Sequence, residues 1–347
     1  NNSLGGDHGT CCAGAASGHA DDPSAVLGVN EGTAGLAGNC RLIGIRRGGT
    51  ETRYADVYVW AAGFNPNSTL AGFPAQINPG ADIITSSFGF SIGSPISGLM
   101  KDAFDFLTTY GRGGKGVALF FSVGNFVPRV DFTLQRPWAA YSKTMACGAS
   151  ALMDDGVTED ISQYSGFGPM LDFCAPSHDA YVGSAPRHNP PTNYGAFTPT
   201  IQGQGNTPGR PTNQTTLSAA AVAGGATINV ASATGFAVGR AVLLRAPGAA
   251  DAEAHQITGV AGTTITLTPA LFDSHPVGTA VAVSTRDYKN DFGGTSYATP
   301  VCAGLAALML SANRNLTWIE VRELIRSTAV KIDPNNTDPV GRWRDAA

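Results

Sequence analysis

Three short motifs contain residue types that together could cleave an acyl bond. The first, "DFGGTSYATP" (291–300), puts Ser296 behind two glycines and ahead of a long apolar run. A serine hydroxyl becomes a strong nucleophile only when a positioned base removes its proton. A helix that starts behind Gly293 and Gly294 would aim backbone N–H groups and its positive dipole end at this position. The alternative is that Ser296 merely caps the helix.

The other two motifs supply a base and a hydrogen-bond donor. "GDHGTCCAGAASG" (6–18) contains His8 ahead of small residues that suit a close-packed helix start. An exposed imidazole there can act as a general base. "FFSVGN" (120–125) is an apolar strand that ends at Asn125, whose amide can donate to an oxyanion at the carboxyl end of a central strand. Taken singly, the two residues could be a structural histidine and a turn asparagine.

Short apolar strands and helices alternate around these motifs. Continuous apolar runs suit parallel strands that are covered on both faces. We expect them in "CRLIGIRR" (40–47), "ADIITSSFG" (81–89), "VALFFSVGN" (117–125) and "TMACGAS" (144–150). The pattern predicts an α/β fold with a doubly wound, mostly parallel sheet flanked by helices.

Three helices are predicted around this sheet. The first, over 97–111, should bury one side and stop at Gly111; the residues of that side are Leu99, Ala103, Phe106 and Leu107. "TPVCAGLAALMLSANRN" (299–315) is apolar nearly all round, which predicts a buried helix. "TWIEVRELIRSTA" (317–329) opens with capping-box spacing at Thr317 and Glu320. Its expected packing face is Trp318, Val321, Leu324 and Ile325.

Composition divides the chain. Residues 185–214 are rich in Pro, Gly, Asn and Thr, which is typical of a linker, and 215–285 contain short β-patterned runs. We therefore expect an α/β domain made of 1–185 and 288–347, cut short at both ends. Residues 186–287 would form a linker and an inserted all-β module.

Bulk properties exclude several classes of function. The net charge is −4 and the basic residues are scattered, so nucleic acid is not an expected partner. No run reaches the ~18 apolar residues of a membrane span, and the first ten residues lack the pattern of a signal peptide. The six cysteines are best interpreted mainly as buried thiols that pack like small hydrophobic residues.

In their order along the chain, the three motifs resemble those of the subtilisin-like serine proteases, or subtilases. "HGT", "SVGN" and "GTSYATP" resemble that family's histidine, oxyanion-asparagine and serine motifs, and "ISQYSGFGPMLDFCAPS" (161–177) resembles another of its stretches. "FGGTSYATP", "HGTCCAG" and "LTWIEVR" favour the kexin-like and related bacterial branch. The resemblance covers about 1–185 and 288–335.

The resemblance implies a serine endopeptidase that acts on peptides or proteins through an acyl-enzyme. Ser296 would be the nucleophile, His8 the general base, and Asn125 an oxyanion donor. The substrate backbone would pair with an edge whose residues are Ser87, Phe88, Gly89 and Gly124. No cofactor or metal is required, although family members often carry structural calcium. An extracytoplasmic or secreted location is implied by the resemblance alone.

One residue of the family's triad is missing. Subtilases carry a catalytic aspartate on a strand well upstream of the histidine, whereas only seven residues precede His8 here. Asp7 adjoins His8, so its side chain should point elsewhere and we do not assign it that role. Three explanations remain: a companion fragment carries the aspartate, the chain has been trimmed, or a degenerate subtilase serves as a non-catalytic scaffold that binds peptides or proteins. Without the aspartate this chain should be nearly inactive.

Two further features have open roles. Asp131, six residues beyond Asn125, could line a pocket for a basic substrate residue, or it could be an ordinary loop aspartate. The inserted module could shape substrate access, bind a partner or simply be tolerated on the surface.

Overall fold

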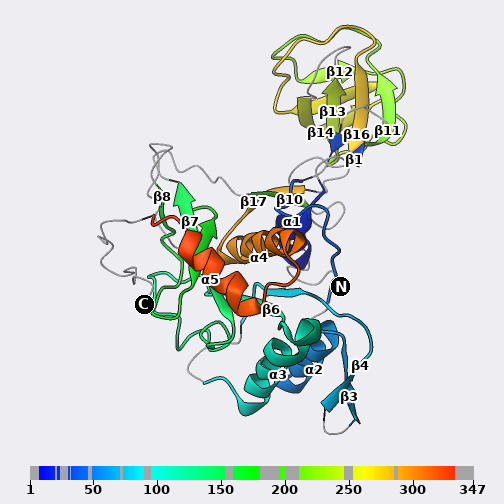
Figure 1. The fold of residues 1–347 in the computed structure, drawn as a ribbon. Helices are drawn as coiled ribbons and strands as arrows, with labels where there is room; N and C mark the ends of the chain where they lie inside the picture. Colours follow the sequence, from blue (N-terminus) through cyan, green and yellow to red (C-terminus); the bar gives the residue numbers. More distant parts are fainter. Residues whose placement is uncertain are drawn as a thin grey trace. The chain divides into compact units, whose positions relative to one another are not determined.

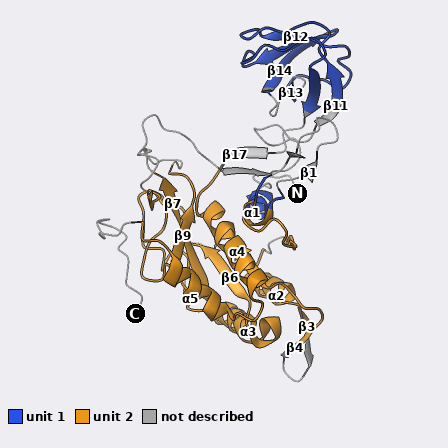
Figure 2. Ribbon diagram, turned by 45° about the horizontal axis from the view of Figure 1, so that its top comes forward, with its two compact units in different colours: residues 1–14, 18–34, 197–290 blue, residues 15–17, 35–196, 291–347 orange. Residues whose placement is uncertain are grey.

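A computed structural model describes residues 8–19, 22–23, 30–31, 33–45, 49–70, 73–89, 95–152, 159–179, 196–199, 211–245, 253–284 and 288–332. The chain divides into two compact units (Figure 2). The first comprises residues 1–14, 18–34 and 197–290, and the second comprises 15–17, 35–196 and 291–347. Most of the predicted linker lies outside the described residues.

The second unit is built on a five-stranded, mostly parallel sheet. Strand β7 is central, since it pairs in parallel with β6 and β9 and antiparallel with β8, while β5 extends the sheet beyond β6 in parallel. The strands are β5 (Ile83–Ser86), β6 (Ala118–Ser122), β7 (Met145–Leu152), β8 (Glu159–Ile161) and β9 (Phe173–Pro176). The α/β fold predicted from the alternation of strands and helices is confirmed.

Helices cover both faces of this sheet. They are α2 (Glu51–Ala61) and α3 (Gly98–Gly114), which lie side by side, and α4 (Thr295–Ala312) and α5 (Trp318–Thr328) (Figure 1). Leu119 and Phe121 of β6 pack into one buried cluster with α2 and α3, whereas Ala118 and Phe120 pack into another with α4 and α5. Because side chains alternate along a strand, β6 needs apolar side chains on both faces, and residues 118–121 supply them before the strand ends at Ser122.

Two helices bury faces that differ slightly from those predicted. Leu99 of α3 is 44% exposed, because the buried face runs one residue later. Leu324 of α5 is 42% exposed, although the rest of its predicted packing face is buried. The predicted stop at Gly111 and the capping box at the start of α5 are both observed. The buried face of α3 is Met100, Ala103, Phe104 and Leu107.

Residues 41–45 differ from the prediction because they form no strand. Leu42, Ile43 and Ile45 are instead exposed. A strand needs a hydrogen-bonded neighbour, and within the described part of the chain nothing pairs with this segment. An extended apolar segment without a partner is unusual for a folded protein, and it borders the cavity described below.

The first unit contains a six-stranded antiparallel sheet in the order β11-β16-β13-β14-β15-β12. The strands are β11 (Pro211–Thr216), β12 (Thr227–Asn229), β13 (Ala241–Arg245), β14 (Glu253–Ala261), β15 (Thr264–Thr268) and β16 (Ala280–Ser284). Its core includes Val242, Leu244, Ile257, Ile265 and Val281. Strands β12 to β16 lie within the predicted β-patterned segment 215–285, whereas β11 begins at Pro211, inside the predicted linker.

Three two-stranded pairs and one further helix complete the described elements. The pairs are β1 (Asp22–Pro23) with β2 (Asn30–Glu31), β3 (Phe64–Leu70) with β4 (Phe73–Gln76), and β10 (Ala196–Pro199) with β17 (Tyr288–Phe292). Helix α1 spans His8–Ser17. Among the described residues, α4 alone is long and apolar enough to cross a membrane, but half of it is buried inside the protein, as in a core helix.

Candidate active site

Ser296 is the second residue of α4 and does not cap it. The helix begins after Gly294, whose φ of 78° is one that glycine adopts readily, and no side chain makes a capping bond there. The cap alternative is therefore wrong. The Ser296 hydroxyl is instead 3.4 Å from the carbonyl oxygen of Ser87, just beyond the end of β5. Ser296 is partly buried beside this glycine turn at the start of the helix.

Asn125 lies against the same turn. Its Oδ1 accepts hydrogen bonds from both the backbone N–H and the hydroxyl of Thr295, each at 2.9 Å. A Cβ atom built on Gly294 would lie 2.7 Å from Asn125 Nδ2, so the amide sits close over the turn. Because two groups donate to Oδ1, this atom must be the amide oxygen. Nδ2 is therefore the atom of the amide that can donate a hydrogen bond. The side chain thus joins the end of β6 to the start of α4.

Residues that we did not predict hold the glycine turn from the other side. Ser177 donates to the carbonyl oxygen of Gly294 at 3.1 Å, and a Cβ atom on Gly293 would lie only 2.0 Å from His178 Nε2. The Tyr164 hydroxyl donates to the His178 carbonyl at 2.6 Å. The stretch quoted for the family resemblance ends at Ser177, next to His178, but nothing in the sequence indicated that these residues contact a turn more than a hundred residues away.

The predicted substrate edge also meets the serine helix. Ser87 donates its hydroxyl to the carbonyl oxygen of Ser296 at 2.9 Å. Phe88 packs its ring 5.5 Å from that of Tyr54. Gly124, with φ of 91°, and Gly89 both pass close to the side chain of Arg136. These residues therefore surround Ser296 and Asn125, while their role in binding substrate stays a prediction.

His8 opens α1 and is exposed. Its Nδ1 is 3.7 Å from Cys12 Sγ, one helical turn later. His8 belongs to the first compact unit and Ser296 to the second. The structure thus brings together Ser296, Asn125 and Ser87, and the catalytic role of His8 stays a prediction.

The remaining titratable candidates have structural surroundings. Asp131 accepts the backbone N–H of Thr133 at 2.9 Å and closes its own loop. Burial raises the pKa of the Cys147 thiol, and it raises that of Cys174 to about 12. These thiols therefore stay protonated in the core, as the sequence indicated. No group of three or more His, Cys, Asp or Glu side chains in the described ranges could hold a metal ion, so we assign no calcium ligand.

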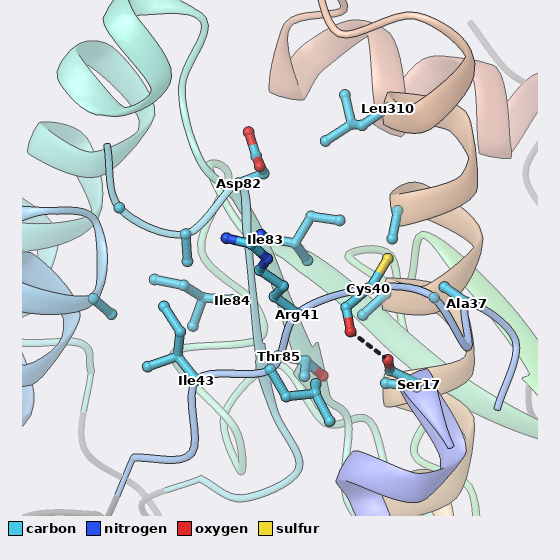
Figure 3. Close-up of a pocket in the computed structure, with 18 of the residues that line it drawn as sticks. Ser17, Ala37, Cys40, Arg41, Ile43, Asp82, Ile83, Ile84, Thr85 and Leu310 are labelled. Carbon is cyan, nitrogen blue, oxygen red and sulfur yellow. Dashed lines mark hydrogen bonds between the residues drawn. The ribbon is translucent and has the colours of Figure 1, made fainter. Parts of the chain in front are cut away.

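A cavity of about 1050 Å³ lies beside the free edge of β5. Its walls include Ile83 and Ile84 of β5, the segment 41–45, and small residues of α4 such as Ala307. Helix α2 lines the cavity as well. Figure 3 shows Ile43 and Ile84 among the lining side chains, with α4 along one side. The cavity thus lies next to β5 in the layer of the sheet, and α2 and α4 border it.

A comparison with protein families gives a match over nearly the whole chain. The model of the subtilase family, Peptidase S8, matches residues 1–342. The chain belongs to the subtilase family. The resemblance predicted from the three motifs is therefore confirmed, although a family match does not assign roles to single residues.

Curated relatives of this subtilase include a bacterial protease and a kexin. A calcium-dependent protease of Trichormus variabilis is 28% identical over 344 residues, which is 94% of this chain and 36% of the relative. Kexin of Saccharomyces cerevisiae is 47% identical over 58 residues, or 17% of this chain and 7% of that protein. This subtilase chain spans about a third of the length of the calcium-dependent protease.

Solved structures similar to this subtilase are also proteases. One is described as proteases from Pseudoalteromonas arctica, with 20% identity, a TM-score of 0.46, and coverage of 94% of this chain and 64% of that one. Another is a cold-adapted subtilisin-like serine proteinase, with 17% identity, a TM-score of 0.43, and coverage of 97% and 72%.

Proposed function

We propose that this subtilase is a serine endopeptidase that hydrolyses peptide bonds through an acyl-enzyme. The observation that carries the proposal is the arrangement of Ser296, Asn125 and Ser87 around one glycine turn. A nucleophile, an amide donor and the end of a strand meet within hydrogen-bond distance of a common helix start. Acyl transfer needs this combination.

The chemistry follows from the roles of these groups. Ser296 Oγ forms a bond to the substrate carbonyl carbon while His8 accepts the hydroxyl proton. The oxygen of that carbonyl becomes negative, and the Asn125 amide and the Ser296 backbone N–H donate hydrogen bonds to it. The C–N bond then breaks, and His8 delivers its proton to the leaving amine. Water hydrolyses the resulting ester by the same steps and regenerates Ser296.

An aspartate from outside residues 1–347 would complete the triad by orienting His8. The cavity beside β5 supports this proposal. A strand residue in a sheet covered on both faces occupies roughly 160 Å³. This volume is the product of the rise per residue, the spacing between strands and the spacing between layers. The cavity of about 1050 Å³ thus has room for about six residues, an ordinary strand length. A parallel strand there would end beside Ser86, at the same end of the sheet as Ser296.

The missing group should limit turnover. Loss of the triad aspartate lowers turnover by roughly four to five orders of magnitude, a figure measured on subtilisin, which belongs to this family. Residues 1–347 by themselves should therefore hydrolyse peptides very slowly. A companion polypeptide that supplies the strand would restore the rate.

A fluorophosphonate probe tests the proposal on native material. Labelling should occur at Ser296 and vanish in Ser296→Ala and in His8→Ala. Ser327→Ala and His19→Ala are matched controls, because both replace the same residue types at exposed positions, and they should label normally. Equal labelling of wild type and Ser296→Ala would contradict the proposal and favour a non-catalytic scaffold.

Intact mass spectrometry under denaturing conditions tests the companion separately. A second, smaller polypeptide that co-purifies with this chain would support the split triad. A single species of this sequence alone would contradict it.

A further inference from the structure

Arg136 crosses the gap between two glycines at the candidate active site. A Cβ atom on Gly124 would lie 2.8 Å from Arg136 Nε, and one on Gly89 would lie 2.9 Å from Arg136 Cδ. Any side chain at either position would collide with the arginine. The segments that follow β5 and β6 border the site. Because each has a glycine there, they leave the space that the Arg136 side chain occupies.

Phe126 and Gln135 provide two of the contacts that position the arginine side chain. Its guanidinium carbon lies 5.2 Å from the centre of the Phe126 ring, a cation–π distance. Its Nη1 donates to the carbonyl oxygen of Gln135 at 3.1 Å. A guanidinium fixed in this way loses little further conformational freedom when it binds a ligand.

A bound peptide would direct one side chain into the same gap. If the substrate pairs with residues 87–89, its reacting carbonyl lies between Ser296 and Asn125. The residue that supplies this carbonyl then projects its side chain between the two backbone segments, because side chains stand off a paired strand. These segments end in Gly89 and Gly124, which Arg136 bridges.

We propose that Arg136 selects substrates with an aspartate or glutamate on the acyl side of the cleaved bond. This inference rests on the proposed function and deepens it. The guanidinium stays protonated at any working pH, and its planar fork matches a carboxylate. The other candidate for this pocket, Asp131, is engaged by its own loop through Thr133. Arg136 therefore replaces the earlier hypothesis of a basic preference.

Peptide binding to the Ser296→Ala chain tests the proposal without requiring catalysis. The probes are acetyl-Ala-Ala-Pro-Glu-amide and the same peptide with glutamine, measured by isothermal titration calorimetry. The glutamate peptide should bind roughly ten- to a hundredfold more tightly, as expected for a charged hydrogen bond. Arg136→Gln should abolish the difference. Arg129→Gln is the matched control, since Arg129 lies over the Phe167 ring nearby, and it should keep the preference.

Cleavage of the matching chromogenic substrates gives a second readout on native enzyme. The ratio of kcat/KM for glutamate over glutamine should fall in Arg136→Gln and should persist in Arg129→Gln. Arg136→Glu should favour lysine. Equal binding of the two peptides, or a preference that survives Arg136→Gln, would overturn the proposal. A preference in binding without any cleavage would contradict the proposed protease activity and leave the acidic selectivity intact.

Discussion

Thr295 fixes Asn125 with two hydrogen bonds to one oxygen, from its backbone N–H and from its hydroxyl. Thr295 is itself almost fully buried. The pair ties the strand that ends at the active site to the helix that carries the nucleophile. It also leaves the amide nitrogen as the only polar atom of Asn125 suited to stabilise an oxyanion.

Asn125→Ala should lower kcat by about two to three orders of magnitude, with a small change in KM. That range comes from removal of the corresponding oxyanion donor in subtilisin, a member of the same family. Steady-state kinetics on a peptide substrate measure it. An unchanged kcat would mean that Asn125 is only a turn asparagine.

Thr295→Val should produce a milder version of the same defect. The substitution keeps the shape and the backbone donor but removes the hydroxyl that bonds Asn125, so we expect kcat to fall about fivefold to tenfold. Thr295 acts here through Asn125. The double variant with Asn125→Ala should therefore be no slower than Asn125→Ala alone, whereas additive losses would contradict this coupling.

Gly293→Ala should destabilise the protein by about 1–3 kcal/mol, because the new methyl group would collide with the His178 ring. Thermal unfolding of the single and double variants measures the effect. His178→Ala should relieve the collision, so the double variant should be more stable than the sum of the two single changes predicts. Gly98→Ala is a suitable control because nothing lies within 4 Å of its added Cβ.

Ala307→Trp should block the strand-sized cavity beside β5. The indole would project among the lining side chains, so the companion polypeptide that we propose should no longer co-purify and peptidase activity should be lost. Leu308→Trp changes the neighbouring residue of the same helix, which is exposed, and it should leave both properties unchanged. Equal co-purification with both variants would mean that the companion binds elsewhere.

Glu253 should make the antiparallel sheet of the first unit sensitive to acid. Burial alone would raise its pKa, but hydrogen bonds from His275, the Phe272 N–H and His255 outweigh burial and hold the pKa below its ordinary value. A carboxylate with a lowered pKa stabilises the fold above its unfolded pKa, and the contribution is lost as pH falls through the folded value.

Urea unfolding from pH 7 to pH 3 measures this effect. Glu253→Gln should be less stable than wild type at pH 7, and the difference should shrink below the ordinary glutamate range near pH 4. Glu323→Gln, at an exposed position, should match wild type at each pH. A constant difference between Glu253→Gln and wild type would contradict the assignment.

Local patterns in the sequence were sufficient to predict the strands β5, β6 and β7 and the helices α3, α4 and α5. The capping box of α5 depends only on Thr317 and Glu320, which are three residues apart, and it forms as expected. The sequence predicted the buried faces of the helices less well. Leu99 and Leu324 are apolar but exposed, because apolar residue type alone does not decide which side of a helix meets the sheet.

The contacts around the turn could not be predicted, since they depend on distant segments. His178 meets Gly293, and Thr295 meets Asn125, only after the chain has folded. The strand predicted over 40–47 is absent from residues 41–45 for a related reason. Its residues are those of a strand, but a strand exists only when another pairs with it.

The cavity beside β5 also has a consequence for solvent contact. Its lining includes Ile43, Ile83 and Ile84, so an empty cavity exposes apolar side chains to water. The chain with an empty cavity should therefore bind more of a dye that fluoresces in apolar surroundings than the same chain with a strand inserted. The fluorescence of the dye would then report occupancy of the cavity without any substrate.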